Sequence, residues 1–287
     1  MSNPVLNKLA EPKRAPARPA PSPEHLQRMW NQPTYQAPVP ATPPGNFPPI
    51  DGKGYGGSGG GGGDAPTRYM TLDDVVVRTG IMLAVVLVTG GLTWSLGPSS
   101  TSAGGLIGIG LIGGLGLGLY MAFTMKANAV TAILYSAFEG LLLGGVSRAF
   151  NDRYPGIVIQ ALTGTMLVAG GMLVVYRSGV IRVTPRFTRM VIGATIGALG
   201  LMVVNLVASF FVHGGLGLRD GGGMAILFSV VCIALAAFNL VLDFDMIEQS
   251  IKRGADQKFA WYASFGLMVT LIWLYIEMLR LIGYLRD

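Results

Sequence analysis

Acidic side chains inside long apolar stretches are the residues of this sequence whose type and setting could do chemistry. Asp243 and Asp245 end the apolar run 224–242, Glu139 lies in the middle of another run, and Glu277 lies in the last one. Carboxylates inside hydrocarbon, or at its edge, are costly and are usually retained for a function. Such groups can contact cations or take up and release protons.

Asp243 and Asp245 have different expected surroundings. Two positions on a helix are about 200° apart, so these carboxylates are not expected to share one ion. Helical spacing groups Asp245 with Glu248, and Asp243 with Asn239 one turn earlier. We therefore predict that Asp243 faces the other helices, close to the cytosolic edge of the hydrocarbon, as a functional carboxylate. The alternative is an interfacial carboxylate with no particular partner.

Glu139 is expected near the middle of its apolar segment. An unpaired, ionised carboxylate is expensive at that depth, so Glu139 should be protonated, paired or hydrogen-bonded to another helix. Asn205 is a candidate partner. Two roles stay open for Glu139, a proton-dependent latch or a structural protonated acid.

Glu277 and Arg280 are three residues apart on the last apolar segment, a spacing that favours a local ion pair. Thr270 lies two turns before Glu277 on the same face. For this ion pair we favour a structural role over a functional one.

Enzyme motifs are absent from the sequence. It contains no serine nucleophile elbow, no P-loop and no His-Glu helix motif. A single cysteine, Cys232, excludes an intrachain disulfide and a cysteine-based metal cluster. We therefore expect no enzyme activity and no cofactor.

The composition is that of an all-α membrane protein. Hydrophobic residues make up 51% of the chain and charged residues 13%, with a mean hydropathy of +0.52. A membrane helix needs about 20 mainly apolar residues. Thr71 and Asp74 form a capping-box pattern at the start of the first helix. Seven segments meet the length criterion: 76–97, 104–125, 130–149, 156–176, 189–212, 224–246 and 259–284. Glycines spaced four residues apart, at Gly110, Gly114 and Gly118, predict close helix packing in the second segment.

The first part of the chain has a different composition. Residues 1–68 hold most of the prolines and end in a glycine tract at 56–63. Such a segment cannot bury enough apolar surface to offset its chain entropy, so we predict a disordered cytosolic tail. Residues 69–287 then form the seven-helix transmembrane domain.

Basic residues predict the orientation of the helices. With a cytosolic N-terminus, most Lys and Arg residues fall in cytosolic connections, as the positive-inside rule requires. That set is Arg68, Arg78, Lys126, Arg177, Arg182, Arg186, Arg189, Lys252, Arg253 and Lys258. We therefore expect a multi-pass plasma-membrane protein with its N-terminus cytosolic and its C-terminus outside. The net charge of +6 is explained in this way without nucleic acid as a partner.

Several stretches together resemble the Bax inhibitor-1/YccA family, also called the transmembrane Bax inhibitor motif family. They are Phe-Glu-Gly-Leu-Leu-Leu-Gly in the third segment, Val-Val-Tyr-Arg-Ser at the end of the fourth, and Leu-Asp-Phe-Asp-Met-Ile-Glu-Gln at the end of the sixth, followed by Trp261. The resemblance runs from about Asp73 to the C-terminus. The Pro/Gly-rich tail and Arg-Val-Thr-Pro-Arg-Phe-Thr resemble the actinobacterial branch of the family.

This resemblance implies a bundle whose last helix is surrounded by the other six, and a pH-sensitive calcium leak controlled by two aspartates that share a proton. The first aspartate matches Asp243, whereas the second falls at Thr270, which has no carboxyl group. An Asp243–Thr270 hydrogen bond remains possible, and Glu139 or Glu277 is the alternative source of a second acid.

Two hypotheses for the function therefore remain open. The first is a leak pathway for calcium or other cations, gated by protons, with Asp243 as the ion-contacting residue and Glu139, Thr270, Asn239 and Glu277 as further candidates. The second is a non-conducting scaffold or stress-response regulator that binds other membrane proteins. Both place the chain in a lipid bilayer.

Overall fold

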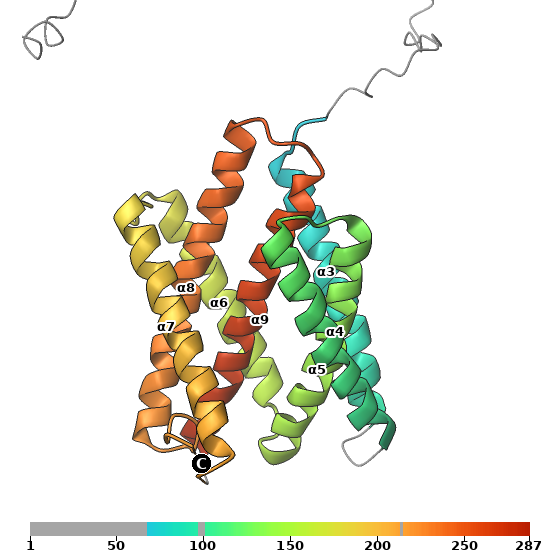
Figure 1. Cartoon of the computed structure of the whole chain (residues 1–287), viewed down its shortest axis with the longest axis vertical. Coiled ribbons are helices and arrows are strands. Elements are labelled where there is room, and N and C mark those ends of the chain that lie inside the picture. The colour runs from blue at the N-terminus through green and yellow to red at the C-terminus, as the bar shows by residue number, and fades with distance from the viewer. Residues whose placement is uncertain (1–67, 97–100, 213–214) are drawn as a thin grey trace, which may run out of the picture. The chain divides into compact units, whose positions relative to one another are not determined.

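The computed structural model describes residues 68–96, 101–212 and 215–287, and almost all of the predicted disordered tail lies outside these ranges. In them, seven helices are long and apolar enough to cross a membrane, which confirms the predicted all-α bundle (Figure 1). The helices are α3 (Leu72–Leu96), α4 (Thr101–Thr124), α5 (Ala129–Arg153), α6 (Ile157–Arg177), α7 (Pro185–Ser209), α8 (Gly223–Lys252) and α9 (Phe259–Arg286).

Local sequence signals fix where several helices begin. The Thr71 hydroxyl accepts a hydrogen bond from the Asp74 N–H at 3.3 Å, and the Asp74 carboxylate accepts one from the Thr71 N–H at 3.0 Å. The predicted capping box at α3 is therefore confirmed. Asn128 and Thr131 form the same reciprocal arrangement at α5, and the Thr184 hydroxyl caps α7 ahead of a proline in its first turn.

Successive helices run in opposite directions, so the connections alternate between two ends of the bundle (Figure 1). We call the end at which α3 begins the α3 face and the end at which α9 ends the C-terminal face. The connections α4–α5, α6–α7 and α8–α9 lie at the α3 face. The connections α5–α6 and α7–α8 lie at the C-terminal face.

Helix α9 forms the centre of the bundle, but six helices do not surround it equally. It packs on α3, α5, α6 and α8, whereas α4 packs mainly on α5 and α7 on α8 (Figure 1). Met268, Leu274 and Leu279 of α9 are completely buried. The arrangement implied by the resemblance is therefore corrected for α4 and α7, which lie further out.

Glycines allow α4 to approach α5 closely. A Cβ added at Gly110 would lie 2.6 Å from the Phe138 carbonyl oxygen, and one at Gly118 would lie 3.3 Å from the Tyr135 ring. The distance at Gly110 leaves no room for a side chain, and the distance at Gly118 is shorter than most real Cβ contacts. The packing role predicted for this glycine row is confirmed.

The segment before α3 is joined to the α8–α9 connection. The Met70 N–H donates to the Ala255 carbonyl at 2.8 Å, and the Gln257 side chain donates to the Asp74 carboxylate at 2.8 Å. Arg78 donates to the Gln257 carbonyl at 2.5 Å. These bonds fix the start of α9 against the start of α3.

Candidate functional site

Asp243 and Thr270 are hydrogen-bonded to each other across α8 and α9. The Thr270 hydroxyl donates to Asp243 Oδ2 at 2.6 Å and also lies 3.2 Å from the Gly266 carbonyl oxygen, one turn earlier. Gly266 lies next to the carboxylate: a Cβ there would be in ordinary van der Waals contact with Asp243 Oδ1, at 3.7 Å. The hydrogen bond that the resemblance left possible is thus present, and Asp243 faces the bundle.

Asp243 lies well inside the length of α8. The helix continues to Lys252, which at 1.5 Å per residue is about 13 Å beyond Asp243. Its partner Thr270 is 7% exposed and lies about 16 Å from the start of α9, at the same rise per residue. The pair is therefore enclosed between two long helices.

Asn239 does not belong to this pair. Its amide donates to the Thr195 hydroxyl of α7 at 2.8 Å and to the Leu235 carbonyl at 2.9 Å. Four residues advance an α-helix by about 400°, so Asn239 and Asp243 differ in direction by about 40°. The two residues thus lie on one side of α8, as their spacing predicts, but Asn239 bonds to Thr195 of α7 whereas Asp243 bonds to Thr270 of α9.

Glu139 faces α4 and is not paired with Asn205. Its Oε1 lies 3.1 Å from the position that a Cβ on Gly114 would take. The Asn205 side chain instead accepts a hydrogen bond from the Leu216 N–H at 2.9 Å, where it orders the α7–α8 connection. The proposed Glu139–Asn205 contact is therefore wrong, because α7 packs on α8, away from α5.

Glu277 is the most buried carboxylate of the bundle that the structure describes, with an exposed fraction of 1%. Its Oε1 accepts from Arg280 at 2.9 Å, which confirms the predicted local pair, and lies 3.4 Å from Arg219 Nη2. Glu277 Oε2 and Arg219 Nη1 are buried, with no hydrogen-bond partner among the described residues. Sequence reasoning missed Arg219, because a loop residue 58 positions away carries no helical spacing signal.

Asp245 and Glu248 form the group predicted from their spacing, with one addition. The Tyr176 hydroxyl, at the end of α6, donates to Glu248 at 2.5 Å and lies 3.5 Å from Asp245. Gln249 also donates to Asp245 at 2.5 Å. Asp245 is thus held on a different side of α8 from Asp243, as their 200° separation requires.

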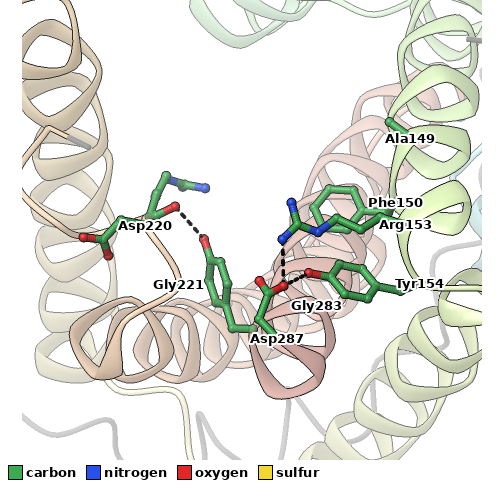
Figure 2. Close-up of a pocket in the computed structure, with 10 residues that line it drawn as sticks. Ala149, Phe150, Arg153, Tyr154, Asp220, Gly221, Gly283 and Asp287 are labelled. Atoms are coloured by element: carbon green, nitrogen blue, oxygen red, sulfur yellow. Dashed lines mark hydrogen bonds and ion pairs between the residues drawn. The ribbon is translucent and has the colours of Figure 1, made fainter. Parts of the chain in front are cut away.

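A pocket of about 370 Å³ opens at the C-terminal face. It is lined by polar and aromatic residues of α5, α9 and the two nearby connections, among them Phe150, Arg153, Tyr154, Arg219, Asp220, Tyr284 and Asp287. Figure 2 shows Arg153 and Tyr154 both directed at the Asp287 carboxylate, which accepts from Arg153 at 2.8 Å. Because Arg219 also lies against Glu277, it connects this pocket to the buried acid.

No resident metal site emerges from the described part of the chain. No group of three or more His, Cys, Asp or Glu residues there has the arrangement to hold a metal ion. Calcium takes six to eight oxygen ligands. Asp243 and Thr270 supply too few for a resident ion, although a passing hydrated ion needs fewer protein contacts.

Seven apolar helices joined by short connections, with carboxylates enclosed between them, define a multi-pass integral membrane protein. A family model described as Bax inhibitor 1 like matches residues 3–287, and the chain belongs to that family. The match confirms the resemblance drawn from the motifs and extends it to the first residues of the tail. No curated protein and no solved structure matches the chain.

Proposed function

We propose that this chain is a low-conductance, pH-sensitive leak pathway for calcium or other cations, in which Asp243 is the ion-contacting and gating carboxylate. The observation that carries the proposal is the hydrogen bond of 2.6 Å between Thr270 and Asp243, enclosed between α8 and α9. A carboxylate placed there attracts a cation when it is ionised. Its protonation removes that charge.

The hydroxyl partner gives the proposed switch a particular pH dependence. Two carboxyl groups that share a proton titrate in two coupled steps. Thr270 does not titrate, so Asp243 takes up one proton without such a partner. The hydrogen bond survives this change, because a protonated carboxyl can donate to the threonine oxygen. We therefore expect flux to follow a simple one-proton curve.

Polar groups along α9 extend the proposed route toward the C-terminal face. Glu277 lies two turns beyond Thr270, about 10 Å along the helix axis. The buried, unpartnered Glu277 Oε2 is a position where water or a passing cation would bind, and the unpartnered Arg219 Nη1 is one where water would bind. The pocket lined by Arg219 and Asp287 would then be the entrance at that face.

The proposed setting is the plasma membrane, with the α3 face cytosolic and the C-terminal face outside. The distribution of Lys and Arg over the connections supports this orientation. No catalytic chemistry is part of the proposal.

Flux measurements in proteoliposomes loaded with a calcium dye test this function. Purified wild type, Asp243→Asn and Thr270→Asp are compared from mildly acidic to mildly alkaline pH. Asp245→Asn is the matched control, because it makes the same charge change two positions away on α8, where the side chain bonds to Gln249. We expect wild type and Asp245→Asn to leak with the same pH dependence and Asp243→Asn to lose it.

Other outcomes decide between the two functions. If Asp243→Asn and Asp245→Asn behave alike, Asp243 is not the gate. If wild type is silent and Thr270→Asp leaks, the fold conducts only with a second acid and this chain has lost the switch. Silence from every variant favours a non-conducting scaffold that binds other membrane proteins. The hydroxyl at Thr270, in place of an acid, is the observation that supports this second candidate.

A further inference from the structure

A second cavity, unrelated to Asp243, lies between α3 and α6. These helices each pack on α9 and leave a groove of about 490 Å³ between them. Leu83 and Trp94 of α3 mark its length, and α5 and α9 form its floor. Leu87 and Met166 stand at its rim with exposed fractions of 65% and 56%, so the groove faces the side of the bundle, where lipid lies.

The lining of the groove suits hydrocarbon better than water or a polar ligand. Most of its surface comes from aliphatic side chains and glycines. Its few hydroxyls already have partners: Ser147 and Tyr275 bond to each other at 2.7 Å, and Thr165 donates to the Ala161 carbonyl at 2.7 Å. An apolar occupant therefore leaves no hydroxyl without a partner.

The length of the groove matches one leaflet of a bilayer. The stretch of α3 from Leu83 to Trp94 covers eleven steps, or about 16 Å at 1.5 Å per residue. The hydrocarbon core of a bilayer is about 30 Å thick, so one leaflet contributes about 15 Å. An acyl chain that enters from the surface would fill this length.

A cation stands at the surface end of the groove. The Arg148 guanidinium lies 5.5 Å from the centre of the Trp94 ring, and its side chain is 34% exposed. Asp152 neutralises part of this charge through a contact of 2.8 Å to Arg148 Nε. The Arg148 Nη groups bond to no other residue that the structure describes, and guanidinium donors bind phosphate well. Tryptophan is enriched at this level of the membrane.

We propose that this groove is a binding site for one phospholipid, with an acyl chain between α3 and α6 and the phosphate at Arg148. The lipid would fill a gap between helices that do not close on each other. The proposal does not depend on conduction, because its test counts bound lipid.

Glycines on α3 supply a matched pair of variants. Gly91 lines the groove, and a Cβ there meets nothing within 4 Å, so Gly91→Leu places a large side chain at the groove without a clash of its Cβ. Gly80 lies on the same helix, is equally open, and does not line the groove. Gly80→Leu therefore controls for the added leucine.

Native mass spectrometry of the delipidated protein, titrated with phosphatidylglycerol, measures the binding. We expect one tightly bound lipid on wild type and Gly80→Leu. For Gly91→Leu we expect binding at least about tenfold weaker, because exclusion of two methylenes already costs that much. Arg148→Gln should also weaken binding. If both leucine variants bind lipid as wild type does, the groove is not the binding site. The same conclusion follows if both variants lose binding to the same extent. Unchanged binding to Arg148→Gln overturns the assignment of the phosphate.

Tryptophan fluorescence independently tests whether the acyl chain of the lipid lies in the groove. Phospholipid brominated along its acyl chain should quench a component of the tryptophan emission that Trp94→Phe removes. If quenching is the same in wild type and Trp94→Phe, no acyl chain lies beside Trp94 and the proposal fails. A stable dimer with this groove buried and no bound lipid would also overturn it.

Discussion

The contact between Asp243 and Thr270 depends on one hydroxyl of α9. Thr270 donates to Asp243 Oδ2 at 2.6 Å. Replacement of Thr270 by a residue without a hydroxyl removes this donor without changing the charge of Asp243. The residue at position 270 therefore determines whether the half-buried Asp243 carboxylate has this donor.

Removal of the Thr270 hydroxyl should destabilise the protein. Thr270→Val keeps the shape but leaves Asp243 without its donor, and a buried group that loses its partner costs about 1–3 kcal/mol. Thr270→Ser keeps the hydroxyl and is the control. Thermal unfolding in detergent should give a clearly lower midpoint for valine than for serine. Equal midpoints would mean that the hydrogen bond contributes nothing to stability.

Asp287 offers a pH test outside the membrane helices. The Tyr154 hydroxyl and then the Arg153 guanidinium hold the pKa of the Asp287 carboxyl below its ordinary value of 3.8. Because the folded pKa is lowered, the stabilisation from these contacts is present above pH 3.8. It is lost as the pH falls through the folded pKa. Neutral and mildly acidic solutions leave the contact intact.

Tyr154→Phe should raise the Asp287 pKa toward 3.8, because it removes the largest cause of the shift. A carbon-13 NMR titration of the aspartate carboxyl groups measures this change. Arg153→Gln should act in the same direction. A titration curve identical to wild type in both variants would contradict the contact.

Helix packing here depends on glycines at the α3–α5 interface as well as on α4. A Cβ at Gly144 would overlap the Gly90 carbonyl group, and a Cβ at Gly90 would lie 3.2 Å from the Gly140 carbonyl oxygen. The two backbones therefore touch. Close approach of this kind drives association where lipid offers no hydrophobic force between helices.

Gly144→Ala should destabilise the protein by about 1–3 kcal/mol, as overpacking of a tight contact does. Gly116→Ala is the control, because a Cβ at that α4 position meets nothing within 4 Å. It should be neutral or stabilise by about 0.5–1 kcal/mol through helix propensity. Detergent-induced unfolding followed by circular dichroism compares the two variants. Similar losses in both would show that the interface is not the cause.

The bundle has two ends, the α3 face and the C-terminal face, and the chain alternates between them from one helix to the next. The α6–α7 and α8–α9 connections lie at the α3 face, and the α7–α8 connection lies at the other (Figure 1). The fold fixes which connections share a side. The Lys and Arg distribution predicts which side is cytosolic.

Cysteine labelling in intact cells tests this orientation. In a Cys232→Ala background, a membrane-impermeant maleimide should label Asp220→Cys from outside. Ser178→Cys and Lys258→Cys should react only after lysis. The reverse pattern would invert the proposed orientation, and different sides for Ser178 and Lys258 would contradict the fold itself.

Much of the architecture follows from local rules that the sequence carries. The thickness of a bilayer fixes the length of an apolar segment, so all seven helices are predictable, and the Thr71–Asp74 cap marks the first start. The Glu277–Arg280 pair is equally local, because three residues bring the side chains to one helix face. Glycine spacing predicts which face of α4 makes a close contact. The predicted tail stays a prediction.

Only the tertiary structure decided which helices meet. Membrane helices are apolar on most sides, so their sequence pattern does not say which face packs on which neighbour. The Arg219 contact to Glu277, the different partners of Asn239 and Asp243 and the position of Asn205 all follow from packing across 11 to 58 residues of chain. The Asp243–Thr270 bond was indicated by family resemblance rather than by spacing, because two side chains on different helices meet only after those helices have packed.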